Sequence, residues 1–107
     1  MFNKEMFEEQ ANLQAILKHK YPDNLGLRHL IGCTELAKEV TEVLDCFPWK
    51  MVSDMQSASR EQLCEELVDV FKFFMNLLII HGITEEEFKL AYDAKSRKVR
   101  ERLCQKT

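Results

Sequence analysis

The chain has 107 residues and a formal net charge of −3, with 31% charged and 46% hydrophobic residues. This length predicts a single domain spanning residues 1–107, and the composition is ordinary for a globular protein. The small negative charge argues against nucleic-acid binding by the chain as a whole. No apolar run approaches the roughly 20 residues of a membrane-spanning helix, and the first residues show no signal-peptide pattern. We therefore expect neither a membrane nor a nucleic acid as a partner.

The four cysteines form no C-x-x-C motif; they are Cys33, Cys46, Cys64 and Cys104. Each stands alone within a helical pattern, which is typical of reduced thiols in a cytoplasmic protein. We expect a cytoplasmic location for this reason. Cys64 is the cysteine that we place near the acidic residues described below, and we expect it to be buried.

Helical periodicity recurs along the chain, and no segment shows the alternation of a β-strand. The first helix is expected over residues 3–20 and ends at the sequence YPDNLG, because proline and glycine disfavour helix continuation. The second helix is expected over residues 25–47, and Pro48 ends it. Its apolar stripe consists of Leu36, Val40, Val43 and Phe47.

Two capping boxes predict the starts of the remaining helices. They are SREQ at residues 59–62 and TEEE at residues 84–87. The third helix is expected to run to His81, with Gly82 as the residue that follows the C-cap. The fourth is expected over residues 85–104. The chain is thus predicted to be all-α with four helices.

The third helix is apolar over more than half of its circumference, and its polar residues occupy a narrow arc. Glu66 and Asp69 lie in this arc one turn apart, with Glu65 beside them, and like charges at this spacing repel. Glu39 and Glu42 have the same relation on the second helix. If the two helices pack antiparallel, four carboxylates converge, and they cannot all stay ionised without a cation. Mg²⁺ suits such a cluster, with Mn²⁺ as a substitute; the alternative is a solvated acidic strip.

A carboxylate-bridged di-iron centre is a weaker alternative for the same acids. It requires Glu-x-x-His on facing helices, and the three histidines are not so placed. We expect each of them to be an ordinary surface or helix-end histidine: His19, His29 and His81.

In their order along the chain, E-x-x-E at residues 39–42 and E-x-x-D at residues 66–69 resemble the signature of the all-α nucleoside triphosphate pyrophosphohydrolases. This superfamily includes MazG-like enzymes, dCTP pyrophosphatases and dimeric dUTPases. The stretch KEVTEVLDCFPWK is similar to the dCTP pyrophosphatase branch, and EELVDVFKFFMNLLIIHGITEEEF resembles the MazG pattern. The segment AYDAK, with the later Arg102, resembles the tail of the dimeric dUTPases. The resemblance covers residues 35–102, and it departs from the pattern at Thr41, usually glycine, and at Val99, usually asparagine.

The resemblance implies a four-helix MazG-like bundle completed by assembly into a homodimer or homotetramer. It also implies hydrolysis of a nucleoside triphosphate, dUTP or dCTP, to the monophosphate and pyrophosphate. The Mg²⁺ ligands would be Glu39, Glu42, Glu66 and Asp69. Either Glu39 or Glu42 would act as the general base, and Lys95 would stabilise charge on the phosphoryl oxygens.

The residues expected to contact substrate are Gln10, Trp49, Phe73, Asn76, Tyr92, Lys95 and Arg102. Gln10 resembles a base-contacting glutamine of the dimeric dUTPases, and Trp49 suits base stacking. Asn76 could bond a sugar hydroxyl or a metal ligand, or could instead make polar contacts between helices. Lys95 lies in an apolar stripe, which is uncommon for an unpaired lysine, although snorkelling would also explain it.

Two other classes of function fit the same pattern. One is a non-catalytic helical module that dimerises through its apolar faces and carries acids for solubility. The other is a regulatory nucleotide-binding protein with the same pocket but without turnover. Release of pyrophosphate in the presence of Mg²⁺ separates the enzyme from both.

Overall fold

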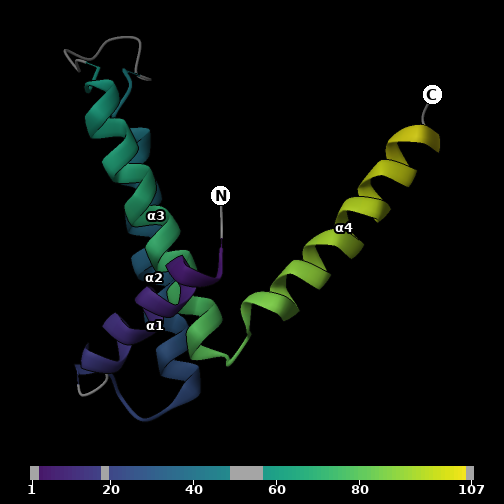
Figure 1. Cartoon of the computed structure of the whole chain (residues 1–107). Coiled ribbons are helices and arrows are strands. Elements are labelled where there is room, and N and C mark those ends of the chain that lie inside the picture. The colour runs from purple at the N-terminus through teal and green to yellow at the C-terminus, as the bar shows by residue number, and fades with distance from the viewer. Residues whose placement is uncertain (1–2, 18–19, 49–56, 106–107) are drawn as a thin grey trace.

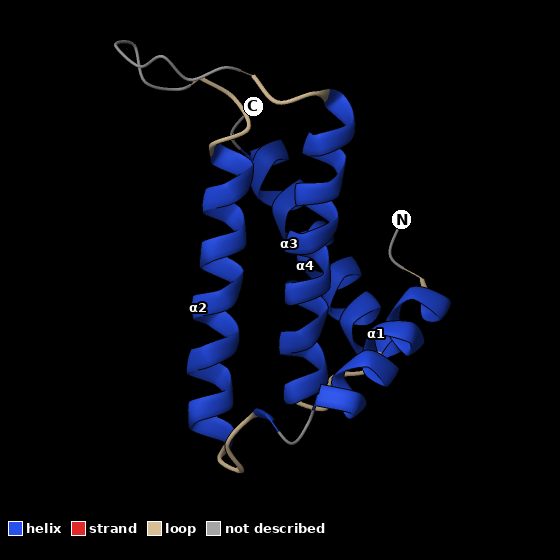
Figure 2. Cartoon of the chain, turned by 90° about the vertical axis from the view of Figure 1, so that its left-hand side faces the viewer, coloured by secondary structure: helices blue, strands red, loops and turns tan. Residues whose placement is uncertain are grey.

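The computed structural model describes residues 3–17, 20–48 and 57–105. These residues form four helices and no strand, in the order α1 (Lys4–Leu17), α2 (Leu25–Leu44), α3 (Arg60–Ile80) and α4 (Glu85–Gln105) (Figures 1 and 2). The prediction of an all-α fold is therefore confirmed.

The helices begin where side chains satisfy their first free N–H groups. At α2, the side chain of Asn24 accepts a hydrogen bond from the Leu27 N–H at 3.0 Å. At α3, Ser59 Oγ accepts from the Gln62 N–H at 3.1 Å, while Gln62 Oε1 accepts from the Ser59 N–H at 2.9 Å. The predicted capping box at residues 59–62 is thus present in full.

The connection between α3 and α4 turns at Gly82, which has φ 67° and follows the C-cap residue His81. Its N–H donates to the Ile79 carbonyl at 3.1 Å, and the next N–H, of Ile83, donates to the Leu78 carbonyl at 2.8 Å. This left-handed conformation favours glycine. The prediction of Gly82 as the residue after the C-cap is confirmed.

The predicted end of α2 is wrong by three residues, because the helix ends at Leu44 rather than Phe47. The N–H of Cys46 donates to the Val43 carbonyl at 3.0 Å, which is the three-residue spacing of a tightened last turn. Pro48 restricts only Phe47, since the residue directly before a proline is disfavoured in the helical region. Asp45 and Cys46 leave the α-helix before that point, through the tightened last turn.

Helices α2 and α3 lie side by side and antiparallel (Figures 1 and 2). Gly32 permits their close approach, because a Cβ atom there would lie 2.7 Å from Leu77 Cδ2. Near the opposite end of the pair, the Ala58 N–H donates to the Cys46 carbonyl at 2.8 Å. Helix α1 crosses the lower half of α3 (Figure 1). The antiparallel arrangement that the acidic cluster required is therefore present.

Helix α4 leaves the other helices at an angle of 107° to α3 (Figure 1). Its first turn contacts α3 through the Phe88 ring, which packs edge-on against Phe74 with centroids 5.3 Å apart. Farther along, Leu90 and Leu103 are 72% and 61% exposed. The radius of gyration is 17.1 Å, whereas a compact domain of this size has about 13 Å. One chain thus leaves α4 outside the packed group of α1, α2 and α3.

Within the described ranges, no single helix combines the length and apolar character needed to cross a membrane. Helices α3 and α4 pass that test by length and composition only when taken together across their bend.

Candidate metal centre and nucleotide site

The antiparallel pairing of α2 and α3 brings three glutamates together. Glu39, Glu42 and Glu66 each offer a carboxylate oxygen, and these oxygens lie within 4.8 Å of one another. All three residues are half-buried. The E-x-x-E motif of α2 and the first acid of the E-x-x-D motif of α3 therefore meet in the fold as their spacing predicted.

Two carboxylate oxygens of this cluster lack a partner, because Glu39 Oε2 and Glu66 Oε2 are buried without a hydrogen bond. Burial raises the pKa of both carboxyls. The hydrogen bond and charge of Glu42, together with the charge of Asp69, raise these pKa values further. Among the described residues, no salt bridge to a lysine or arginine compensates the cluster. Ionisation of all these carboxyls is therefore unfavourable unless a cation binds among them.

The donor set fits Mg²⁺, which prefers hard oxygen ligands from one or two carboxylates and otherwise keeps water or phosphate oxygens. Asp69 is half-buried, and its charge acts on both Glu39 and Glu66, but it lies outside the group within 4.8 Å. Three of the four predicted ligands are thus brought together directly, and the fourth acts on them electrostatically.

A cavity of about 420 Å³ adjoins the cluster. It is lined by Glu42, Asp45, Cys46, Ala58, Gln62, Glu65 and Glu66. Such a cavity gives an ion and its attached phosphates access to the carboxylates of Glu42 and Glu66.

The cysteine of this cavity is Cys46, and the expectation that Cys64 would be the buried cysteine near the acids is wrong. Cys64 is exposed, whereas Cys46 is buried and its Sγ donates to the Glu42 carbonyl at 3.4 Å. Burial raises the pKa of the Cys46 thiol, and the neighbouring acids, Glu66 foremost, raise it further. The thiol therefore stays protonated, which does not favour it as a metal ligand or a nucleophile.

Two predicted substrate residues lie where α1 crosses α3. Gln10 and Asn76 are each only 6% exposed, and Gln10 Nε2 donates to Asn76 Oδ1 at 2.7 Å. Phe73 is half-buried on α3, between Asp69 and Asn76 in the sequence. Trp49 lies outside the described residues.

The three predicted residues of the last helix lie elsewhere. Tyr92, Lys95 and Arg102 are exposed on α4, which diverges from the helices that carry the glutamates (Figure 1). Within one chain, therefore, the structure does not bring these side chains to the carboxylate cluster.

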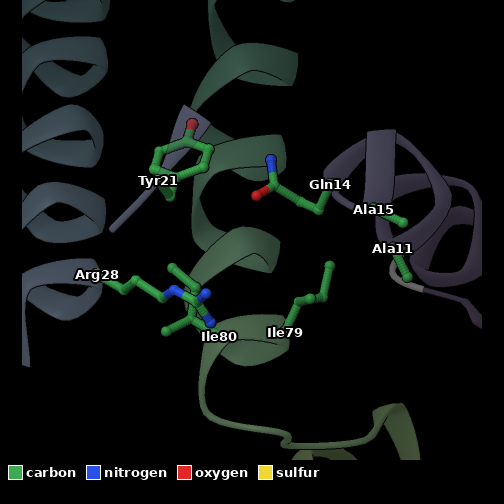
Figure 3. A pocket seen from close by; sticks show the side chains of 7 residues that line it. All are labelled: Ala11, Gln14, Ala15, Tyr21, Arg28, Ile79 and Ile80. Atoms are coloured by element: carbon green, nitrogen blue, oxygen red, sulfur yellow. The ribbon is translucent and has the colours of Figure 1, made fainter. Parts of the chain in front are cut away.

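A second cavity, of about 280 Å³, lies at the opposite end of α3 (Figure 3). Its lining includes the amide of Gln14 from α1, the ring of Tyr21 and the guanidinium of Arg28 from α2, with Ile79 and Ile80 of α3. Arg28 Nε donates to the Pro22 carbonyl at 2.7 Å, which holds the arginine at the start of α2.

Sequence reasoning did not identify this second cavity. Burial raises the pKa of Tyr21, and the charge of Glu35 raises it further, so the acidic face of α2 reaches the tyrosine. One sequence signal did point toward this cavity: the glutamate stripe of α2 continues from the E-x-x-E motif to Glu35, the residue whose charge acts on Tyr21. The path of the α1–α2 connection, which brings Tyr21 to the cavity, has no sequence signal.

Two histidines also meet at this end of the molecule. His29 Nδ1 and His81 Nε2 lie 2.8 Å apart, and Cys33 Sγ lies 3.6 Å from His29 Nε2. Both histidines are exposed and lie near helix ends, as the sequence predicted. Their pairing follows from the antiparallel register of α2 and α3.

Comparison with known proteins adds one finding to this geometry. A family model described as dUTPase matches residues 3–106, which is nearly the whole chain and more than the resemblance predicted. No significant match is found among curated proteins or among solved structures.

Proposed function

Because the chain belongs to this dUTPase family, whose members act as hydrolases on nucleoside triphosphates, we propose that it converts dUTP or dCTP to the monophosphate and pyrophosphate in a Mg²⁺-dependent reaction. The observation that carries the proposal is the meeting of Glu39, Glu42 and Glu66 within 4.8 Å, with two buried carboxylate oxygens that lack partners.

Glu39, Glu42, Glu66 and Asp69 are the proposed Mg²⁺ ligands. When bound, Mg²⁺ would neutralise and orient the triphosphate and stabilise the charge that develops during its cleavage. The carboxylates hold this position because helices α2 and α3 fix them against each other along an antiparallel interface. Charge repulsion among the acids is the reason that a cation binds here.

Glu39 or Glu42 is the proposed general base. Its carboxylate accepts a proton from the attacking water as the P–O bond between the α- and β-phosphates breaks. The products are then the monophosphate, which retains the base and sugar, and pyrophosphate.

Lys95 is proposed to stabilise charge on the phosphoryl oxygens, with Arg102 and Tyr92 as further phosphate or sugar contacts. Since α4 diverges from the carboxylates of its own chain (Figure 1), we infer that a second copy supplies these three residues. A homodimer is the smallest assembly that completes the site, and a homotetramer would do so equally.

The test is to incubate the protein with Mg²⁺ and each deoxynucleoside triphosphate and to measure pyrophosphate release. We expect release from dUTP or dCTP, and loss of release when Mg²⁺ is chelated. Glu66→Gln and Asp69→Asn should each lower turnover by more than about 100-fold. Glu61→Gln is the matched control, because Glu61 is an exposed acid in the first turn of the same helix.

The outcome also separates the two rival functions. A regulatory binder would show a nucleotide-dependent rise in thermal midpoint without product. A dimerisation module would show neither product nor a Mg²⁺-dependent rise. Unchanged turnover in both Glu66→Gln and Asp69→Asn would show that the site is assigned to the wrong residues.

A further inference from the structure

One thiol and two imidazoles meet at the end of the α2–α3 pair that lies away from the carboxylates. Cys33 Sγ lies 3.6 Å from His29 Nε2, and the other ring nitrogen of this histidine, Nδ1, lies 2.8 Å from His81 Nε2. The His29 ring thus stands between a thiol and a second imidazole. None of the three residues belongs to the carboxylate cluster or lines either of the two cavities described above.

The meeting of these side chains follows from the helices that carry them. His29 and Cys33 are four residues apart on α2, so they lie on one face of the helix, one turn apart. His81 is the C-cap of α3, directly before the left-handed turn at Gly82. The two imidazole rings are inclined at 68° with centroids 5.0 Å apart, whereas the bonded nitrogens are 2.8 Å apart, so these nitrogens face each other. The His29 ring is therefore held at both of its nitrogens.

The hydrogen-bond chemistry of imidazole links the three groups into one chain. When the Cys33 S–H donates to His29 Nε2, that nitrogen carries no proton, and a neutral imidazole then carries its proton at Nδ1. The Nδ1–H donates to His81 Nε2. If His29 takes up the thiol proton, it still donates through Nδ1 to the same acceptor, and this bond stabilises the imidazolium beside the thiolate. A nucleophile, a base within reach and a third group that orients the base are the signature of an activated nucleophile.

The exposure of the cluster indicates which reactant it suits. Cys33, His29 and His81 are all exposed, so a solute reaches the sulfur directly. Acyl transfer needs a pocket for the substrate and preorganised donors for an oxyanion, and neither cavity described above is lined by Cys33. Exchange with a disulfide needs an accessible thiol and the removal of its proton. The cluster therefore favours a small disulfide as its reactant.

We propose that Cys33 is a site of thiol–disulfide exchange with low-molecular-weight disulfides, with His29 as the base and His81 as a positioning residue that holds His29. The Cys33 sulfur attacks one sulfur of R–S–S–R while its proton passes to His29 Nε2. The bond between the two reagent sulfurs breaks, and the leaving thiolate takes a proton back from His29 Nε2. The products are a mixed disulfide on Cys33 and one thiol, R–SH; the Cys33 sulfur is oxidised and the leaving sulfur is reduced.

The test measures mixed-disulfide formation with oxidised glutathione on the reduced, full-length protein at pH 7 in EDTA. Mass spectrometry of peptides gives the initial rate at each cysteine. Cys64 is the internal control, because it is exposed on α3 and no histidine nitrogen of the described residues lies within hydrogen-bond distance of it. We expect Cys33 to react at least about tenfold faster than Cys64, since an unassisted thiol is only slightly ionised at neutral pH. Equal rates overturn the proposal.

The role of His29 is tested with His29→Gln, which removes the basic nitrogen and keeps a polar side chain. This variant should slow the reaction of Cys33 about tenfold and leave that of Cys64 unchanged. At about pH 10, where an ordinary thiol ionises without a base, variant and wild type should agree within about twofold. A structural effect of the substitution would persist at both pH values. Such persistence, or an unchanged rate at pH 7 in the folded variant, overturns the role of His29 as base.

The role of His81 is tested with a pair of substitutions. His81→Leu removes the acceptor for the Nδ1–H of His29 and should slow the reaction of Cys33 about threefold to tenfold. His81→Gln keeps an acceptor oxygen and should restore the rate to within about twofold of wild type. A folded His81→Leu variant with the wild-type rate, or a His81→Gln variant as slow as His81→Leu, overturns the positioning role.

The proposal can be tested whatever becomes of the variants or of the proposed function. Circular dichroism shows whether each variant is folded, and the comparison of Cys33 with Cys64 in the wild-type protein needs no variant. Pyrophosphate release enters none of these measurements, so its absence would overturn the proposed function and leave the exchange rates at Cys33 as they are.

Discussion

At the scale of single residues, Glu66 combines two properties that both disfavour its ionised form. One of its oxygens is buried without a hydrogen bond, and its charge lies beside Glu42 and Glu39. The first property destabilises the ionised carboxylate in the metal-free protein, and the second does so again through repulsion. A residue that lowers stability when the site is empty is better explained by binding than by folding.

Glu66→Gln should therefore raise the thermal midpoint of the protein in the presence of a chelator, because it removes one of three converging charges. The same variant should lose the rise in midpoint that Mg²⁺ produces in the wild-type protein. Differential scanning fluorimetry with EDTA and with Mg²⁺ measures both effects. Glu61→Gln should behave like the wild type. A lower midpoint for Glu66→Gln in EDTA would mean that the cluster stabilises the metal-free fold.

Residue spacing placed each acidic motif on one helix face and predicted that four carboxylates converge if the two helices pack antiparallel. The structure brings Glu39, Glu42 and Glu66 together, whereas Asp69 lies outside the group within 4.8 Å. The same reasoning could not find the bond between Gln10 and Asn76, which depends on where α1 crosses α3. It also placed the buried cysteine of the site at position 64 rather than 46. Cys46 follows the last turn of α2, where the chain folds back toward α3, and periodicity does not extend past a helix end.

At the scale of helices, the N-terminal cap of α3 determines where the helix that carries Glu66 and Asp69 begins. Ser59 and Gln62 form a reciprocal capping box at the start of α3, about two turns before Glu66. Ser59→Ala removes the acceptor for the Gln62 N–H and should cost about 1 kcal/mol of stability, or about 4–8 °C in thermal midpoint. Ser57→Ala is the control, since Ser57 is exposed and precedes the cap. Equal midpoints for the two variants would show that the box contributes no stability.

The interface of α2 and α3 depends on Gly32. Gly32→Ala should stay within about 1 kcal/mol of wild type, because the gain in helix propensity is about 1 kcal/mol and the clash is with the end of the flexible Leu77 side chain. The larger side chain of Gly32→Ile cannot be accommodated by a shift of the Leu77 side chain alone, and this variant should lose about 1–3 kcal/mol of stability. Chemical denaturation measures both variants.

Ala37→Ile is the matched control for Gly32→Ile, since Ala37 lies on α2 but is exposed. Equal stability of these two isoleucine variants would mean that the close approach at Gly32 is not a constraint. An isoleucine at position 32 should also push α2 away from α3. Because the carboxylates lie on both helices, Gly32→Ile should therefore weaken the Mg²⁺-dependent rise in thermal midpoint.

The bounds of the helices were largely predictable, whereas the direction of α4 was not. Capping boxes and Gly82 are local signals, and each has a fixed position relative to its helix end. The angle of 107° between α3 and α4 depends instead on what α4 packs against. Its exposed Leu90 and Leu103 show that its own chain does not cover it beyond the first turn.

At the scale of the whole molecule, the uncovered face of α4 and the large radius of gyration predict an assembly of at least two chains. Sedimentation or light scattering should give a mass of twice the chain mass of 12.6 kDa or a larger multiple. Leu90→Asp and Leu103→Asp together should reduce that mass toward the monomer, since charged residues are unfavourable in a buried apolar contact. A wild-type monomer at working concentration would contradict the assembly.

If a second copy supplies Lys95, two inactive variants should complement each other. Lys95→Ala loses the cation and Glu66→Gln loses the carboxylate, so neither homodimer has an intact site. In a mixed dimer with shared sites, one site carries both substitutions and the other carries neither. Equal mixing after reversible unfolding should then restore about a quarter of wild-type activity, measured as pyrophosphate release. Mixing Lys95→Ala with itself is the control. Failure of a confirmed mixed dimer to regain activity would place Lys95 in the site of its own chain, and α4 would then have to close onto α2 and α3.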